Sequence, residues 1–249
     1  MRLFRQTFTF FVLFPTLVSA QEQLEKKIVQ TTQGWEYQIS NISDNALLAY
    51  RVTFKCPSVN GAKEQVYQHQ EDALVQFGGR AKLLAKQARS FKIPASVVDC
   101  PGDVTAAIFE DGTTFGDSAN LSYLYEMRRG TYLALVFAKR QIDSMPVGDD
   151  LNSIANALDV ERQKRTGDRA LAEPTWVGEV SALSYIAIVL RKQSEMHVPS
   201  DETPQRQPLI SDLAASAKVS PRKAQATIMS GKLYEWIAAL EGNIQMPKS

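Results

Sequence analysis

The chain has 249 residues, of which 44% are hydrophobic and 22% are charged, an ordinary composition for a globular protein. Its formal net charge of +1 gives no general attraction to a polyanion such as nucleic acid. A run of about 18 apolar residues would be needed for a membrane span, and none occurs beyond residue 20.

Residues 1–20 have the three parts of a secretory signal peptide. Arg2 and Arg5 form a positively charged start, residues 8–17 are mostly apolar, and Val18-Ser19-Ala20 is a small-residue cleavage site. A transmembrane anchor is the alternative, but the apolar run is about half as long as a span requires. Cleavage after Ala20 would leave 26 basic and 27 acidic residues. The sequence therefore predicts a secreted or periplasmic protein.

The next part of the chain is rich in predicted strands. Residues 21–33 are polar, and we expect a loose leader or a short helix there. The following strands are expected from apolar–polar alternation and from Pro and Gly at their ends: 34–41, 47–56, 65–68, 72–77, 88–93, 104–109 and 113–115. Asp111-Gly112 supplies the turn between the last two. This spacing is typical of an antiparallel β-sandwich of immunoglobulin type, with a small barrel as the alternative.

Two strand–turn–strand segments, residues 38–50 (QISNISDNALLAY) and 108–117 (IFEDGTTFGD), carry a resemblance to known proteins. The chain resembles a group of uncharacterised secreted bacterial proteins that contain an immunoglobulin-like or fibronectin-III-like domain. The resemblance covers roughly residues 34–140. It implies the β-sandwich fold for this region and implies no activity.

From residue 118 the apolar spacing becomes helical. Asp117 or Ser118 can cap a helix over 118–142, and its two apolar sides predict that it packs between the sandwich and later helices. Further helices are expected over 150–166, 177–196, 209–218 and 221–242, the second of these apolar almost all round and therefore buried. The predicted fold is α+β: a signal peptide (1–20), an N-terminal antiparallel immunoglobulin-like β-sandwich (21–117) and a C-terminal α-helical bundle (118–249).

The chain contains two cysteines, Cys56 and Cys100. In an exported protein an even pair most simply forms a disulfide, and two buried free thiols are the alternative. A structural zinc site normally takes four ligands, so two cysteines do not make one.

Three acidic residues beside the last predicted turn, Glu110, Asp111 and Asp117, are candidate calcium ligands because calcium binds oxygen ligands. The segment lacks the alternating acidic pattern of a calcium-binding loop, and a hairpin turn with a helix cap explains the same residues. We therefore expect no metal ion and no cofactor.

Two other chemistries are suggested by parts of the chain. Residues 209–240 resemble a helix-turn-helix in outline, but export and the lack of a basic surplus argue against DNA. Neither His69 nor His197 lies in a hydrolase motif, although a carboxylate pair could meet only in the fold. The sequence thus favours a non-catalytic binding or scaffold protein that engages another protein or an envelope component. The alternative is a hydrolase of unknown class with a helical lid.

Overall fold

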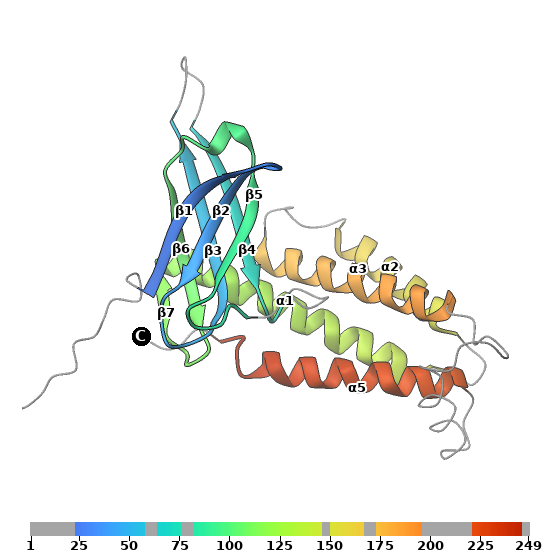
Figure 1. Cartoon of the computed structure of the whole chain (residues 1–249). Helices are drawn as coiled ribbons and strands as arrows, with labels where there is room; N and C mark the ends of the chain where they lie inside the picture. The colour runs from blue at the N-terminus through green and yellow to red at the C-terminus, as the bar shows by residue number, and fades with distance from the viewer. Residues whose placement is uncertain are drawn as a thin grey trace, which may run out of the picture.

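The computed structural model describes residues 23–57, 64–75, 82–145, 150–166, 173–195 and 221–245. Within these ranges seven β-strands come first and four α-helices follow. The strands stand together at one side of the molecule and the helices extend from one end of them (Figure 1). The protein is therefore a mixed α+β protein, as predicted. The predicted signal peptide lies outside the described residues and stays a prediction.

The strands form two antiparallel sheets. The three-stranded sheet has the order β1 (Leu24–Thr31), β2 (Gly34–Asn41), β5 (Ala88–Ile93). The four-stranded sheet has the order β4 (Gln65–Asp72), β3 (Leu47–Cys56), β6 (Gly102–Phe109), β7 (Thr114–Gly116). The two sheets do not close on each other, so the barrel alternative is wrong.

The bounds of β2, β3 and β5 are those predicted, but two neighbouring predictions are wrong. Residues 24–31 are neither a leader nor a helix, because β1 pairs with β2 along its whole length, from Leu24 opposite Asn41 to Thr31 opposite Gly34. The strand expected over 72–77 is also absent from the described residues, because Asp72 ends β4 and residues 73–75 form a turn.

One hydrophobic core lies between the two sheets. The Tyr37 ring of β2 is 5.0 Å from the Phe54 ring of β3 and 5.4 Å from the Phe91 ring of β5, measured between centroids. The register of β3 against β6 shifts between Leu47 and Ala49, and this irregularity puts Leu47 into the core. Tyr50, Val52 and Phe54 of β3 face the same core, so strict alternation would place Leu48 there; the bulge reverses the alternation and places Leu47 there instead.

The outer face of the four-stranded sheet is covered by the start of α1 (Ser118–Asp143). Asp117 caps this helix, since its carboxylate accepts a hydrogen bond of 2.8 Å from the Asn120 amide. A small buried cluster joins sheet and helix: Ala49, Ala106, Ile108, Leu121, Leu124 and Tyr125. Farther along, α1 enters the core of the helical half. The helix therefore contacts both halves, but one after the other along its length.

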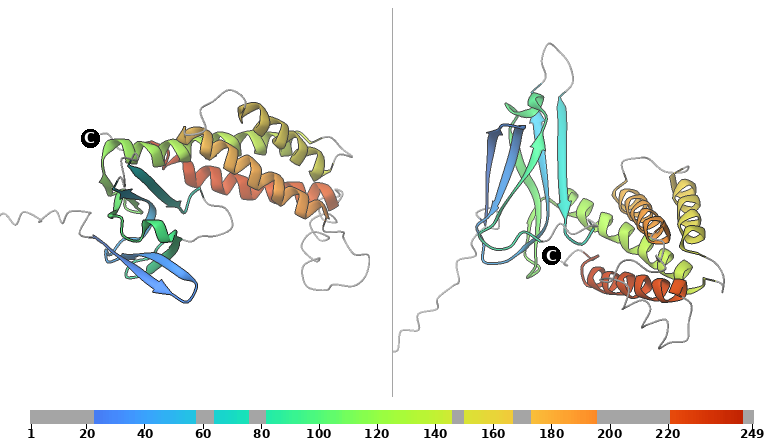
Figure 2. Two further views of the ribbon diagram at one scale, coloured as in Figure 1. Left: turned by 90° about the horizontal axis from the view of Figure 1, so that it is seen from above. Right: turned by 45° about the vertical axis from the view of Figure 1, so that its right-hand side comes forward.

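The remaining helices pack around the outer part of α1. Two of them, α2 (Leu151–Thr166) and α3 (Pro174–Glu195), are neighbours, and α3 lies between α2 and α1. On the other side of α1 lies α5 (Pro221–Glu241) (Figure 2). A Cβ at Gly130 would overlap the Thr175 carbonyl oxygen, so this glycine allows α1 and α3 to approach closely. No helix in the described ranges is long and apolar enough to cross a membrane.

Candidate functional site

The end strands β4 and β5 of the two sheets lie along one side of the strand half, and side chains join them there. The His69 ring stacks on the Phe91 ring at 3.6 Å between centroids. Beside it, Arg89 Nη1 lies 3.1 Å from Glu71 Oε2, and the Glu71 side chain is only 3% exposed. These contacts fill the space between β4 and β5 at the end of the strands that is nearer the helices.

Toward the opposite end of the same side, a pocket of about 320 Å³ opens between the sheets. Gln65, Val66 and Tyr67 of β4 form one wall, and Pro94, Ser96 and Val97, which follow β5, form the other. Cys56 at the end of β3 completes the lining. This end of the strands points away from the helical half (Figure 1). We call it the disulfide-end pocket.

The disulfide that gives the pocket its name is the one predicted. Cys56 and Cys100 are bonded with an S–S distance of 2.01 Å, across a sequence separation of 44 residues. Both sulfur atoms face the Ser96 carbonyl oxygen, Cys100 Sγ at 3.6 Å and Cys56 Sγ at 3.9 Å. The bridge therefore ties the end of β3 to the segment before β6 and supports the wall that contains Ser96.

The described lining of the disulfide-end pocket has no charged side chain. Its polar groups are a phenol, a primary amide and a hydroxyl, from Tyr67, Gln65 and Ser96. Val66 is an exposed apolar side chain of this lining, at 53% exposure. The lining residues in the described part of the chain include no Asp, Glu, His or Lys side chain that could act as a general acid or base. Neutral hydrogen bonds, apolar surface and the backbone of an end strand are what the pocket offers to a ligand.

The three predicted candidate metal ligands have other partners. Glu110 lies 2.5 Å from the Lys82 ammonium. Asp111 accepts hydrogen bonds from the Asn45 amide group at 2.6 Å and from the Thr113 backbone at 2.9 Å. Asp117 caps α1, and the hydrogen bonds from Asn120 hold its pKa below the ordinary value. Within the described ranges, no group of three or more His, Cys, Asp or Glu residues is placed to hold a metal ion.

A buried ion pair lies where the strand half meets the helices. Arg128 of α1 and Asp72 at the end of β4 both have fully buried side chains, with Nε and Oδ2 2.6 Å apart. Arg128 Nη2 donates a second hydrogen bond of 3.2 Å to Asp72 Oδ1. Burial raises the pKa of Asp72, and the charge and hydrogen bonds of Arg128 oppose this rise. The pair is enclosed in the junction, so its role is structural.

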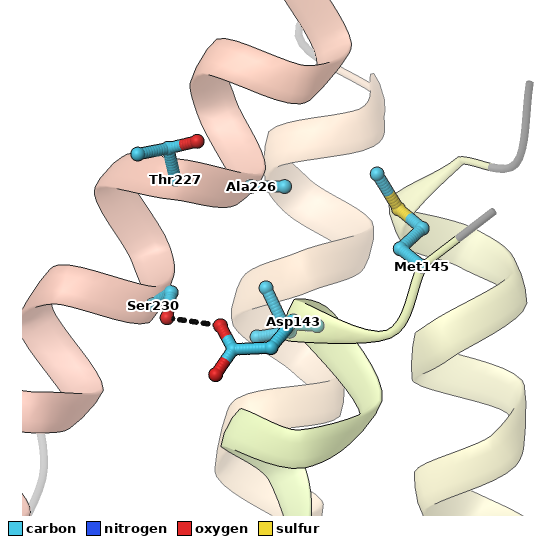
Figure 3. A pocket seen from close by; sticks show the side chains of 6 residues that line it. Asp143, Met145, Ala226, Thr227 and Ser230 are labelled. Carbon is cyan, nitrogen blue, oxygen red and sulfur yellow. Dashed lines mark hydrogen bonds between the residues drawn. The ribbon is translucent and has the colours of Figure 1, made fainter. Parts of the chain in front are cut away.

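A second pocket, of about 180 Å³, lies between the end of α1 and α5. The Ser230 hydroxyl donates a hydrogen bond of 2.5 Å to Asp143 Oδ1 across it (Figure 3). Hydrogen bonds from Lys139 and Ser230 lower the pKa of Asp143. A carboxylate stabilised in this way is a weak base, so the Ser–Asp pair is poorly suited to activating a nucleophile.

The other predicted features are only partly described. His197 and the predicted helix over 209–218 lie outside the described residues, whereas α5 follows the predicted helix over 221–242 closely. No family model, no curated protein and no solved structure matches this chain. The site must therefore be interpreted from its own residues.

The sequence did not single out the residues of the disulfide-end pocket or of the buried ion pair. Val66 and Tyr67 indicated only that this segment is a strand, and Pro94 indicated only that a strand ends before it. Asp72 and Arg128 are 56 positions apart and belong to no motif. A usable signal was present only in the cysteines, because a predicted disulfide at Cys56 marks that end of β3 as rigid.

Proposed function

We propose that this protein is an exported, non-catalytic binding or scaffold protein that engages another protein or an envelope component through the disulfide-end pocket. The observation that carries the proposal is an exposed apolar side chain, Val66, on an end strand beside a pocket braced by a disulfide. Exposed loops and strand ends on a rigid framework are common positions for binding residues.

Export is supported by two independent features. Residues 1–20 have the composition of a signal peptide, and the only two cysteines are joined in a disulfide. Disulfides persist in oxidising compartments such as the periplasm and the extracellular space. We propose a secreted or periplasmic location on this basis.

We further propose that the strand half is an immunoglobulin-like sandwich. The proposal is supported by the strand order, since β1-β2-β5 opposite β4-β3-β6-β7 has the pattern of strands A-B-E opposite C′-C-F-G in such domains. It is also supported by a core that both sheets share. The disulfide differs from that of antibody domains, because it joins β3 to the segment just before β6, a strand of the same sheet, and does not join the two sheets.

The partner that suits the disulfide-end pocket is an extended segment of another protein. β4 has β3 as its one strand neighbour within the described ranges. An end strand can pair with an added strand through its backbone, while a neighbouring pocket takes a side chain of the added segment. The neutral lining favours an apolar or aromatic side chain over a charged one.

The hydrolase alternative is less well supported. His69 stacks on Phe91 and faces Glu71, and the low pKa of Asp143 makes the Ser230 pair a weak catalytic unit. Since no specific observation favours this alternative, we do not propose it.

Capture of a partner from envelope extract would test the proposal. The variant Val66→Lys places a charge on the end strand, which should prevent strand addition, and retention of the partner should be lost. The matched control is Val160→Lys, because Val160 of α2 is also exposed to solvent, at 65% against 53% for Val66, but lies in the helical half. A partner retained by Val66→Lys, or lost from Val160→Lys alone, would place the binding surface elsewhere.

Export has its own test. The intact mass of the protein recovered from the envelope or medium should correspond to a chain that begins at Gln21. Mass spectrometry is preferable to stepwise sequencing, because an N-terminal glutamine can cyclise and block the terminus. Recovery of the protein with Met1 still attached would rule out cleavage at Ala20.

A further inference from the structure

The side chains of β4 alternate between the two faces of its sheet beside the disulfide-end pocket. The strand register places Phe54 of β3 opposite Tyr67 of β4, and the two rings are 5.7 Å apart between centroids. Tyr67 therefore packs against the core between the sheets. Because successive side chains point to opposite faces, Val66 points to the outer face, whereas Gln65 shares the inner face with Tyr67.

A strand added along the outer edge of β4 would follow the same alternation. Residues that lie opposite each other on neighbouring strands point to the same face, with their Cβ atoms about 4.5–5.5 Å apart. The added residue opposite Tyr67 would therefore direct its side chain into the pocket. The next inner-face position, opposite His69, has less room, because the His69 ring stacks on Phe91 there. A large side chain of the added strand is thus best accommodated opposite Tyr67.

The size and walls of the pocket suit one aromatic side chain. Its volume of about 320 Å³ is at the lower end of the ~300–1,000 Å³ range of small-molecule sites, so it can hold a large side chain but little more. Tyr67 and Pro94 line it with rings, and Cys56 lines it beside them. Aromatic rings and sulfur atoms both make favourable contacts with another aromatic ring.

Two neutral polar side chains distinguish among aromatic residues. The Gln65 amide and the Ser96 hydroxyl can each donate and accept a hydrogen bond. Neither side chain has a hydrogen-bond partner among the described residues. A phenol combines an aromatic ring with one hydroxyl that also donates and accepts. A charged group would lose its hydration and meet no opposite charge in the described lining.

We propose that the residue of the added strand that fills the disulfide-end pocket is a tyrosine. Its ring lies opposite Tyr67, and its hydroxyl forms a hydrogen bond with Gln65 or Ser96. This inference rests on the strand addition proposed above and names the side chain that makes it selective. Phenylalanine would fill the same space without forming the hydrogen bond, and lysine or glutamate would bury an unpaired charge.

Three small molecules test this selectivity on the full chain. p-Cresol, toluene and 4-methylbenzoate reproduce a tyrosine side chain, a phenylalanine side chain and an anionic ring of similar size. In a titration followed by amide NMR, p-cresol should shift the resonances of residues 65–67 and 95–97. It should bind about threefold to tenfold more tightly than toluene, the ratio expected from one net neutral hydrogen bond. 4-Methylbenzoate should leave these resonances unchanged.

One double variant assigns the difference to the two polar side chains. Gln65→Val/Ser96→Ala should lower the affinity for p-cresol to that for toluene and leave toluene binding unchanged. The control Ser181→Ala removes an exposed hydroxyl of α3 in the helical half and should change neither affinity. Toluene binding as tightly as p-cresol, or stronger binding of N-acetylglucosamine at the same amides, would overturn the tyrosine proposal.

The outcomes also separate this inference from the proposed function. If Val66→Lys loses the partner while p-cresol leaves residues 65–67 and 95–97 unshifted, strand addition stands and the tyrosine is wrong. If p-cresol binds as expected but Val66→Lys retains the partner, strand addition is overturned, and the tyrosine of an added strand is overturned with it.

Discussion

The two ends of the strand half are held together in different ways. At the end away from the helices, the Cys56–Cys100 disulfide braces an exposed pocket. At the end that meets the helices, the Arg128–Asp72 pair is fully buried. One end is fixed by a covalent bond near solvent, and the other by charges from which solvent is excluded.

This contrast separates effects on the unfolded chain from effects on the folded one. A disulfide stabilises mainly by restricting the unfolded chain, in the chain-entropy account. A buried ion pair acts in the folded state, where its attraction roughly offsets the cost of desolvating both charges. The disulfide should therefore raise the free energy of unfolding without determining how the strand half and the helices pack together. The ion pair should define where α1 docks on β4 while adding little net stability.

The largest expected effect tests whether the two halves depend on each other at all. Leu135→Asp in the helical core and Leu124→Asp at the sheet–helix seam each bury an unpaired charge at a position of 0% exposure. Each should cost several kcal/mol, close to the ~5–15 kcal/mol that holds an ordinary domain together. Because α1 contributes both to the helical core and to the cluster on the outer face of the four-stranded sheet, we expect each variant to unfold the whole chain. Urea unfolding followed by circular dichroism would measure the loss.

Hydrogen exchange of the β3 amides shows whether the unfolding is shared. Loss of β3 protection in Leu135→Asp would mean that damage in the helical core reaches the sheets through α1. If β3 keeps its protection while the helices exchange freely, the strand half and the helical half fold independently, as two separate domains.

The second prediction concerns the buried pair. Arg128→Met leaves the Asp72 carboxylate buried without its partner and should cost about 3–5 kcal/mol. The double variant Arg128→Met/Asp72→Leu removes both charges and should recover most of this loss, because a buried pair contributes little beyond its own desolvation cost. Chemical denaturation of the three proteins gives the numbers. A double variant as unstable as the single one would show that the pair is a net source of stability.

The third prediction concerns the disulfide end. Cys56→Ser/Cys100→Ser opens a loop of 44 residues and should cost about 3–4 kcal/mol in the chain-entropy account. Amide protection should fall around residues 93–104 and persist at the start of α1, since the cost falls on the far end. Equal loss of protection at both ends would show that the disulfide also supports the junction.

The strands that sequence predicted well are those with a clear pattern. β3 alternates between apolar and polar residues from Tyr50 to Cys56 and is followed by Pro57, and its bounds were predicted correctly. β1 was missed because its charged residues, such as Lys26 and Lys27, hide any alternation. An end strand that pairs on one side and is only partly buried needs no apolar face, so its sequence carries little signal.

The candidate site was less accessible from sequence, for a different physical reason. The disulfide was predicted because the chain has only two cysteines, so only one pairing was possible. The pocket depends on how β4 lies against the segment that follows β5, and the Arg128–Asp72 pair depends on how α1 meets the end of β4. Both are products of tertiary packing, which neither the period of a strand nor that of a helix encodes.

The smallest expected effect concerns the cap at the start of α1, where the strand half passes into the helices. Asp117→Ala removes the acceptor of the Asn120 amide hydrogen bond and should cost about 1 kcal/mol at neutral pH. Asp117→Asn keeps a side-chain oxygen that can cap, so it should cost less. Urea unfolding of the wild type and the two variants, at a series of pH values, provides the measurement.

The pH dependence separates the charge of this cap from its hydrogen bond. The pKa of Asp117 is lowered in the folded state, so the folded protein holds the ionised form more strongly than the unfolded chain does. The resulting stability is present above the unfolded aspartate pKa of about 3.9 and is lost as the pH falls through the lower folded value. The stability difference between the wild type and Asp117→Asn should therefore shrink or reverse in that acidic range. The destabilisation of Asp117→Ala at neutral pH is the largest effect expected from losing the cap. A difference that does not change with pH would mean that the carboxylate acts only as a hydrogen-bond acceptor.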